Sequence, residues 1–321
     1  MKLIVQIPCL NEEEALPLTV RDIPRIIEGI DKVEILVIDD GSTDRTSEVA
    51  RELGINHVIR FSSTQGLARA FMAGLDASLK QGADIIVNTD ADNQYQGEDI
   101  AALIKPIVEG RADIVVGNRV TDIIEHFSAA KKILQKAGSW VVRKVSGTQI
   151  PDATCGFRAY SREAALKINV ISEFTYTLET IIQAGKKNIA IDHVTIRTNQ
   201  PLRKSRLYSN TMSYIKRSIS TIFRIYAMYE PLKTFFYIGG LVFSAGIMLS
   251  LRFLYFYFSR SGAGHVQSLI LAAILIIIGF QIIIIGLVAD LISGNRRLIE
   301  DNLYRLKKLE LFLSTTRGKG D

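Results

Sequence analysis

Cysteine and tryptophan are scarce in this chain of 321 residues. Its 2 cysteines are Cys9 and Cys155, and their spacing suits neither a metal site nor a disulfide framework. So few cysteines exclude a disulfide-stapled secreted domain and fit a reducing, cytosolic compartment. The 1 tryptophan is Trp140.

Two common nucleotide-binding patterns are also missing. The chain has neither a GxGxxG sequence nor a Walker-type loop, so dinucleotide oxidoreductases and P-loop enzymes have no support. The first apolar run ends at Asn11 and three glutamates, and we therefore expect no secretory signal peptide. No internal repeat or low-complexity tract is present.

Basic residues outnumber acidic residues, 39 to 33, which gives a formal net charge of +6. Such a balance suits nucleic acid, a membrane surface or an anionic substrate. The basic residues gather on both sides of two long apolar segments, at Arg203, Lys204, Arg206, Lys216, Arg217 and Arg224 and again at Arg296, Arg297, Arg305, Lys307 and Lys308. This placement favours a membrane over nucleic acid.

The two apolar segments predict a transmembrane hairpin. Residues 234–251 carry no charge and lead, after Arg252, into a further apolar run, and residues 266–289 carry no charge either. Each segment is long enough to cross about 30 Å of hydrocarbon as a helix. The connection at 259–265 is short and polar, and Lys and Arg are abundant outside the hairpin. By the positive-inside rule we expect both termini and the soluble part in the cytoplasm.

Residues 1–120 alternate between strand-like and helix-like runs. The expected strands are 2–7, 33–38, 57–61, 84–88 and 113–117, and the expected helices are 13–30, 44–53, 66–81 and 98–109. This alternation predicts an α/β domain with a mostly parallel sheet and helices on both faces. Ligands of such sheets bind beyond the carboxyl ends of the strands.

Polar clusters follow three of the expected strands. They are Pro8–Glu12, Asp39–Asp44, and Asp90 to Gln94. Asp90 and Asp92 can point into one cleft, where a pair of carboxylates can hold a divalent cation that bridges a nucleotide diphosphate. Each cluster also has a purely structural interpretation: Asn11 with Glu14 as a capping box, the Asp40 sequence as a turn, and Asp-x-Asp as turn chemistry.

Taken together, these clusters resemble the family 2 glycosyltransferases of the GT-A fold, and most closely their dolichol-phosphate mannose synthase-like branch, which glycosylates polyprenyl phosphates. The matching pieces are Pro8-x-x-Asn11-Glu12, Val37-Ile38-Asp39-Asp40-Gly41-Ser42-x-Asp44, Asp90-Ala91-Asp92-x-Gln94, Gly117-Asn118-Arg119 and Asp152-x-x-x-Gly156-Phe157-Arg158. Their order matches across residues 1–205, and the basic stretch before the hairpin fits as well.

The resemblance implies a role for each matching residue. The donor, a UDP- or GDP-linked sugar, would be bound by Pro8, Glu12, Asp39, Asp40, Asp90, Ala91, Asp92 and Arg119. Asp92 and Gln94 would ligate Mg²⁺ or Mn²⁺. Arg203, Lys204 and Arg206 would meet the acceptor phosphate. Asp152, Asp92, Arg119 and Arg203 would form the catalytic set, with Asp152 as a base or an orienting residue; its structural alternative is a helix cap or turn.

Two features depart from the branch. Leu10 replaces a tyrosine, and the segment after Asp92 lacks a proline pair, which leaves the base and the sugar open. With Trp140 as its 1 tryptophan, the chain also lacks the Gln-x-x-Arg-Trp motif of processive synthases, so transfer of a single sugar is expected.

These inferences give a domain plan. We expect a GT-A domain over 1–205, an amphipathic interfacial helix over 206–231, a transmembrane hairpin over 232–290 and a cytoplasmic helix or tail over 291–321. Apolar residues at Ile299, Leu303, Leu306 and Leu313 predict that the tail packs on the catalytic domain or between subunits of a homo-oligomer.

The expected activity is that of an inverting, metal-dependent glycosyltransferase acting on a polyprenyl phosphate at the inner leaflet of the cytoplasmic membrane. Two alternatives remain: a glycolipid synthase with a lipid hydroxyl as acceptor, and a catalytically silent membrane scaffold with the same fold.

Overall fold

The computed structural model describes residues 1–119, 129–172, 175–200, 211–259 and 266–317. The chain forms two compact units. The first, here called the sheet unit, consists of Met1–Ile222 and Leu303–Asp321, and the second, the hairpin unit, of Phe223–Asn302.

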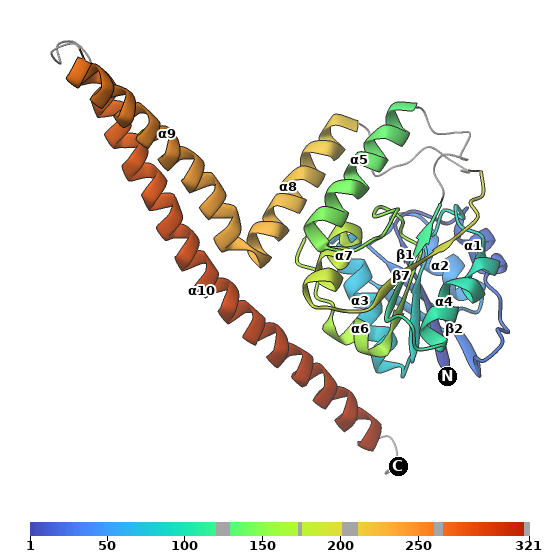
Figure 1. Ribbon diagram of the computed structural model, residues 1–321. Helices are drawn as coiled ribbons and strands as arrows, with labels where there is room; N and C mark the ends of the chain where they lie inside the picture. The colour runs from blue at the N-terminus through green and yellow to red at the C-terminus, as the bar shows by residue number, and fades with distance from the viewer. Residues whose placement is uncertain (120–128, 173–174, 201–210, 260–265, 318–321) are drawn as a thin grey trace. The chain divides into compact units, whose positions relative to one another are not determined.

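A 7-stranded sheet lies at the centre of the sheet unit, in the order β3-β2-β1-β4-β6-β5-β7 (Figure 1). The strands are β1 (Lys2–Cys9), β2 (Lys32–Asp39), β3 (His57–Arg60), β4 (Ile85–Asn88), β5 (Ile114–Asn118), β6 (Arg158–Ser161) and β7 (Ile191–Thr195). β6 runs antiparallel to β4 and β5, and the other pairs are parallel. The expected mostly parallel sheet is confirmed.

The central strands are covered on both faces, which explains their nearly continuous apolar sequences. In β1 and β2 almost every residue is buried. Cys9 pairs with Asp39 across β1 and β2, and Gln6 pairs with Asn88 across β1 and β4. This register brings the carboxyl ends of three strands, with the polar clusters that follow them, to one edge of the sheet.

Helices cover both faces of the sheet (Figure 1). One group comprises α1 (Leu16–Asp22), α2 (Thr46–Glu52), and α4 (Ile100–Val108) with the short 3-10 helix η1 (Gly97–Asp99) before it. The other comprises α3 (Leu67–Lys80), α6 (Arg162–Lys167) and α7 (Tyr176–Lys186), with α5 (Ala129–Ser146) packed on α7.

The expected helix over 13–30 is wrong in length. α1 ends at Asp22, and Ile23 is extended, with φ −75° and ψ 120°. Ile23 precedes Pro24, and a residue before proline is disfavoured in the α region. The capping box is wrong as well, because α1 starts at Leu16 without a side-chain cap.

The hairpin unit contains α9 (Pro231–Ser259) and the first part of α10 (Val266–Arg317). Both helices are long and apolar enough to cross a membrane. Their backbones approach closely at glycines: a Cβ on Gly239 would lie 2.8 Å from the carbonyl oxygen of Gly279, and a Cβ on Gly279 would lie 2.6 Å from the nitrogen of Phe243. Small residues permit such contact between membrane helices.

Two further helices bear on the expected membrane-proximal segments. α8 (Thr211–Tyr229) falls within the segment where an amphipathic helix is expected. α10 does not end near Ala289 but continues through Asp290 and Arg296 to Arg317 as one helix of 52 residues.

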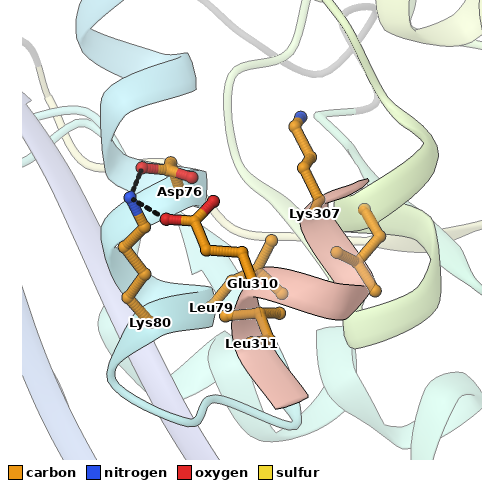
Figure 2. Close-up of a pocket in the computed structure, with 7 residues that line it drawn as sticks. Asp76, Leu79, Lys80, Lys307, Glu310 and Leu311 are labelled. Carbon is orange, nitrogen blue, oxygen red and sulfur yellow. Dashed lines mark ion pairs between the residues drawn. The ribbon is translucent and has the colours of Figure 1, made fainter. Parts of the chain in front are cut away.

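The end of α10 packs on α3 and α6 within the sheet unit (Figure 2). Lys80 of α3 forms ion pairs with Asp76 at 3.0 Å and with Glu310 at 3.2 Å. Leu311 is 7% exposed, and the hydroxyl of Tyr304 donates to Glu163 of α6. The tail therefore packs on the sheet domain of its own chain, one of the two expected arrangements.

Ile299, Leu306 and Leu313 of the expected apolar stripe are exposed and do not make that contact, and Leu303 is half-buried. The contact instead uses Tyr304, Lys307 and Leu311, which lie three and four residues apart on one helical face.

Leu311 supplies a direct test of this packing. We expect Leu311→Ala to lower the free energy of unfolding of the sheet unit by about 2 kcal/mol, the lower end for a buried leucine. Leu306→Ala, in the same helix at a 62% exposed position, is the matched control and should have almost no effect. Thermal unfolding of the purified full-length protein in detergent measures both. Equal losses for the two variants would show that α10 does not pack here.

Candidate active site

The loops after β1 and β2 are joined by hydrogen bonds. Asn11 has a φ of 56°, its side-chain oxygen accepts from the nitrogen of Thr43 at 2.8 Å, and its own nitrogen donates to Ser42 Oγ at 2.9 Å. The nitrogen of Glu12 donates to Thr46 Oγ1 at 2.8 Å. These bonds hold the expected donor-binding residues of the first two loops together in one structure.

Asp39 and Asp40 are both buried and both organise backbone. Asp39 accepts from the nitrogen of Ser42 at 2.7 Å and from the hydroxyl of Ser47. The two carboxylate oxygens of Asp40 accept from the nitrogens of Gln65 at 2.7 Å and Gly66 at 2.9 Å. Asp40 therefore anchors the loop before α3, as the turn interpretation expects.

Gly41 makes this arrangement possible. Its φ is 75°, and a Cβ would lie 2.7 Å from backbone atoms of Ser63 and Thr64. A left-handed conformation and a backbone contact this close both require glycine.

The Asp90–Gln94 loop is held from two sides. The hydroxyl of Thr19 in α1 donates to the carbonyl of Ala91 at 2.9 Å. Asn199, which follows β7, donates from its side chain to the carbonyl of Asn93 at 3.0 Å and from its nitrogen to the carbonyl of Gln94 at 2.9 Å. The nitrogen of Gln94 also donates to Asp92 at 3.2 Å. Asp92 and Gln94 are thus adjacent parts of one restrained loop.

Asp90 lies against the loop that precedes β6. A Cβ on Gly156 would lie 2.9 Å from Asp90 Oδ2, so glycine is needed there. The hydroxyl of Tyr95 hydrogen-bonds to Asp90 and accepts from the nitrogen of Gly156 at 3.2 Å. Burial and the charge of Asp92 raise the pKa of Asp90 to about 7, against the opposing effect of Arg119.

The chemistry of this loop fits a divalent cation. Asp90, Asp92 and Gln94 offer hard oxygen donors, which Mg²⁺ and Mn²⁺ prefer. Burial is the larger cause of the raised pKa of Asp90 and repulsion from Asp92 is the second; a cation bound at these carboxylates would relieve that repulsion. Within the described ranges, no group of three His, Cys, Asp and Glu side chains could hold a metal by itself. An ion here would need the Gln94 amide and oxygens from a ligand.

Arg119 and Asp152, two expected catalytic residues, form an ion pair. Arg119 donates from Nε to Asp152 Oδ2 at 2.7 Å and from Nη2 to Oδ1 at 3.1 Å, and Nη2 also donates to Thr154 Oγ1 at 2.8 Å. Burial opposes the charge of Arg119, yet Asp152 raises the pKa of Arg119 well above its ordinary value. The guanidinium therefore stays charged.

Asp152 itself is 2% exposed and also accepts from the nitrogen of Thr154 at 3.2 Å. This hydrogen bond closes a turn, which is the structural role expected for Asp152 as the alternative to a catalytic role. Protonating Asp152 would sacrifice a bidentate ion pair, so Asp152 is a poor general base in this arrangement.

Arg158 is the last residue of the Asp152-x-x-x-Gly156-Phe157-Arg158 pattern, and the structure gives it a role. Its side chain is buried and donates to the carbonyls of Ala153, Cys155 and Thr177 and to the hydroxyl of Thr180, at 2.6–2.9 Å. The acceptors Ala153 and Cys155 lie in the segment between Asp152 and Gly156. Arg158 therefore positions both residues.

A buried network behind Asp90 had no role in the sequence interpretation. Gln6 donates to Asn88 Oδ1 at 2.9 Å, and Asn88 donates to the Tyr176 hydroxyl at 2.8 Å and to the carbonyl of Gly156 at 3.0 Å. Polar residues inside the apolar strands β1 and β4 were the available signal for Gln6 and Asn88. Tyr176 has no local signal, because its partner is 88 residues away.

The structure brings Asp90, Asp92, Arg119 and Asp152 into one electrostatic cluster beside Gly156. Pro8 and Asp39 lie at the carboxyl ends of β1 and β2, and Glu12 and Ala91 lie in the loops at the same sheet edge. Arg203, Lys204 and Arg206, the expected acceptor-phosphate residues, lie outside the described residues.

Comparison with known proteins identifies the family of this chain. The profile of glycosyl transferase family 2 matches residues 4–168. The polyprenol monophosphomannose synthase of Mycolicibacterium smegmatis is 35% identical over 174 residues, which cover 52% of this chain and 64% of that protein. The undecaprenyl-phosphate mannosyltransferase of Micrococcus luteus is 31% identical over 53% of this chain and 70% of that protein.

Some relatives match almost the whole chain. The undecaprenyl-phosphate 4-deoxy-4-formamido-L-arabinose transferase of Photorhabdus laumondii is 28% identical over 91% of this chain and 89% of its own length. Among solved structures, glucosyl-3-phosphoglycerate synthase of Mycobacterium tuberculosis with Mn²⁺ and UDP superposes with a TM-score of 0.56. That match covers 71% of this chain and 79% of the other at 18% identity, and so shows the fold alone. The chain thus belongs to glycosyl transferase family 2 and is a glycosyltransferase of the GT-A fold.

Proposed function

We propose that this enzyme transfers one sugar from a nucleotide-sugar to a polyprenyl phosphate at the cytoplasmic face of a membrane. The Arg119–Asp152 ion pair is the observation that carries the proposal. A hydroxyl acceptor needs a free base, whereas Asp152 is engaged with a guanidinium. A phosphate acceptor needs no base and is attracted by the positive charge of Arg119.

Support for the acceptor also comes from the relatives. Two of those described above are named as undecaprenyl-phosphate sugar transferases, and a third as a polyprenol monophosphomannose synthase. The two apolar helices of the hairpin unit suit an enzyme whose acceptor is anchored in a membrane. Arg203, Lys204 and Arg206 remain the proposed first contacts of the acceptor phosphate.

The donor site is proposed at the sheet edge. Pro8, Glu12 and Asp39 would contact the nucleoside, while Asp90 and Ala91 would lie along the diphosphate and sugar. Asp92 and Gln94 would hold Mg²⁺ or Mn²⁺, and the ion would neutralise the charge that develops on the leaving diphosphate. The loop contacts of Thr19 and Asn199 keep these groups in place before the donor arrives.

The reaction is proposed to invert the anomeric centre. An oxygen of the acceptor phosphate forms a bond to the anomeric carbon as the bond from that carbon to the diphosphate breaks. The electron pair leaves with the nucleoside diphosphate. A phosphomonoester is largely dianionic above its second pKa of about 6, so no proton needs to be removed. The fixed positive charge of Arg119 stabilises the converging phosphates.

The metal site is tested by Asp92→Asn. We expect turnover to fall by about 10²–10³-fold, the usual effect of removing a group that stabilises developing charge. EDTA should abolish activity of the unaltered enzyme, and Mn²⁺ or Mg²⁺ should restore it. Thermal stabilisation by UDP, GDP and their sugars with Mn²⁺ identifies the donor independently of turnover. Full activity in EDTA would refute the metal proposal.

Gly156→Ala tests the support of that site without touching a ligand. The new methyl would displace Asp90, and we expect Mn²⁺-dependent donor binding to weaken by about 10–100-fold, as for other disturbed metal surroundings. Gly138→Ala in α5 is the control, because no described atom lies within 4 Å of its new Cβ. Unchanged donor binding in Gly156→Ala would show that the contact with Asp90 has no part in donor binding.

Asp152→Asn separates the two acceptor classes. With a phosphate acceptor we expect kcat/KM to fall about 10- to 100-fold, because one charged hydrogen-bonded pair is lost, while the pH profile keeps its shape. With a lipid hydroxyl, activity should vanish at every pH. Undecaprenyl phosphate and diacylglycerol are compared as acceptors in the same assay. Arg203→Ala should reduce turnover, and Lys204→Ala should mainly raise the KM for lipid.

Membrane orientation is a further part of the proposal. We expect a cysteine at Ser261, in the hairpin connection, to react with an impermeant thiol reagent from outside the cell. A cysteine at Ser314 should react only after permeabilisation. Cys9 and Cys155 are buried, so the unaltered protein provides a low background. Labelling in the opposite order would put the active site on the wrong side for nucleotide-sugars.

A further inference from the structure

α5 has one face packed against the sheet unit. Ser139, Val142 and Ser146 are buried, and they lie three and four residues apart. The backbone contact is close: a Cβ on Gly185 of α7 would lie 1.9 Å from the carbonyl oxygen of Ser146. This face has its partner within the protein.

Three described residues on another face of α5 are exposed. Lys136, Trp140 and Lys144 follow one another at intervals of four residues, which places them in one stripe along the helix. Trp140 is 55% exposed although tryptophan gains more than most side chains from leaving water. The three residues are here called the tryptophan stripe.

The charge of α5 indicates what covers the tryptophan stripe. The helix has no acidic residue, and its basic residues are Lys131, Lys132, Lys136, Arg143 and Lys144. A basic helix with an exposed tryptophan suits an anionic lipid surface, where lysines reach the phosphates and the indole enters the headgroup region. The same chain carries two helices fit to span a membrane, so that a bilayer is the anionic surface within its reach.

We propose that the tryptophan stripe of α5 lies in the headgroup region of an anionic bilayer and is a membrane contact of the sheet unit in addition to the transmembrane hairpin. The contact has a structural link to the active site. Ser139 Oγ accepts from the nitrogen of Ala153 at 3.2 Å, next to Asp152, and Arg143 donates to the carbonyl of Ile150 at 3.4 Å. The buried face of α5 thus holds the turn that pairs with Arg119.

Trp140 is its own reporter, because it is the 1 tryptophan of the chain. The full-length protein is placed in nanodiscs that contain either phosphatidylcholine alone or phosphatidylcholine with phosphatidylglycerol, each with and without brominated acyl chains. In anionic discs we expect brominated lipid to quench tryptophan emission at least twofold and acrylamide to quench it weakly. In zwitterionic discs we expect acrylamide quenching to increase.

Charge reversal supplies the matched comparison. In anionic discs, the double variant Lys136→Glu with Lys144→Glu should lose the quenching of Trp140 emission by brominated lipid and regain its quenching by acrylamide. Arg51→Glu with Lys105→Glu changes the net charge equally at exposed positions of α2 and α4 and should leave both signals unchanged. None of these readouts depends on transfer activity, so their failure is distinct from failure of the proposed reaction.

Two results would overturn the proposal, and both come from the unaltered protein. One is strong acrylamide quenching without bromine quenching in anionic discs, which would leave the tryptophan stripe in water. The other is protection from acrylamide without bromine quenching, which would mean that protein, such as a second copy of the chain, covers Trp140.

Discussion

The guanidinium of Arg158 is buried where no water can solvate its charge, so the backbone around it must do so. Leaving such a charge without partners costs several kcal/mol, and this penalty restricts the surrounding turn to conformations that point carbonyls inward. The carbonyls of Ala153 and Cys155 meet this requirement. Asp152 precedes them and Gly156 follows them, so the ion pair with Arg119 and the contact with Asp90 both depend on how one buried charge is solvated.

The site balances charges of both signs on elements that cannot easily move. Asp90 and Asp92 repel each other, while Arg119 and Arg158 oppose that repulsion from the β5 end and from β6. Each group is fixed by neighbours that are themselves buried, such as Tyr95. Polar groups held in this way stabilise developing charge without reorganising during the reaction. Preorganisation of this kind is usually the largest contribution to the rate enhancement.

The parts of the fold that could be predicted were those encoded locally. β1 to β5 were found within two residues because their apolar runs are nearly continuous. β6 was missed: it has 4 residues, begins with Arg158 and resembles no buried strand. The same division holds in the site. Asp90, Asp92 and Gln94 are neighbours in sequence and could be grouped. Arg119 and Asp152 are 33 residues apart, and only the folded structure shows that they form an ion pair with each other.

Cys155 lies in the turn that Arg158 organises, between Asp152 and Gly156. Burial raises the pKa of this thiol to about 11, despite the opposing influence of Arg119. Near neutral pH the thiolate is therefore a very minor species, and thiolate is the form that reacts with peroxides and alkylating agents. Cys155 is thus chemically quiet in the folded enzyme, although it lies beside the Arg119–Asp152 ion pair.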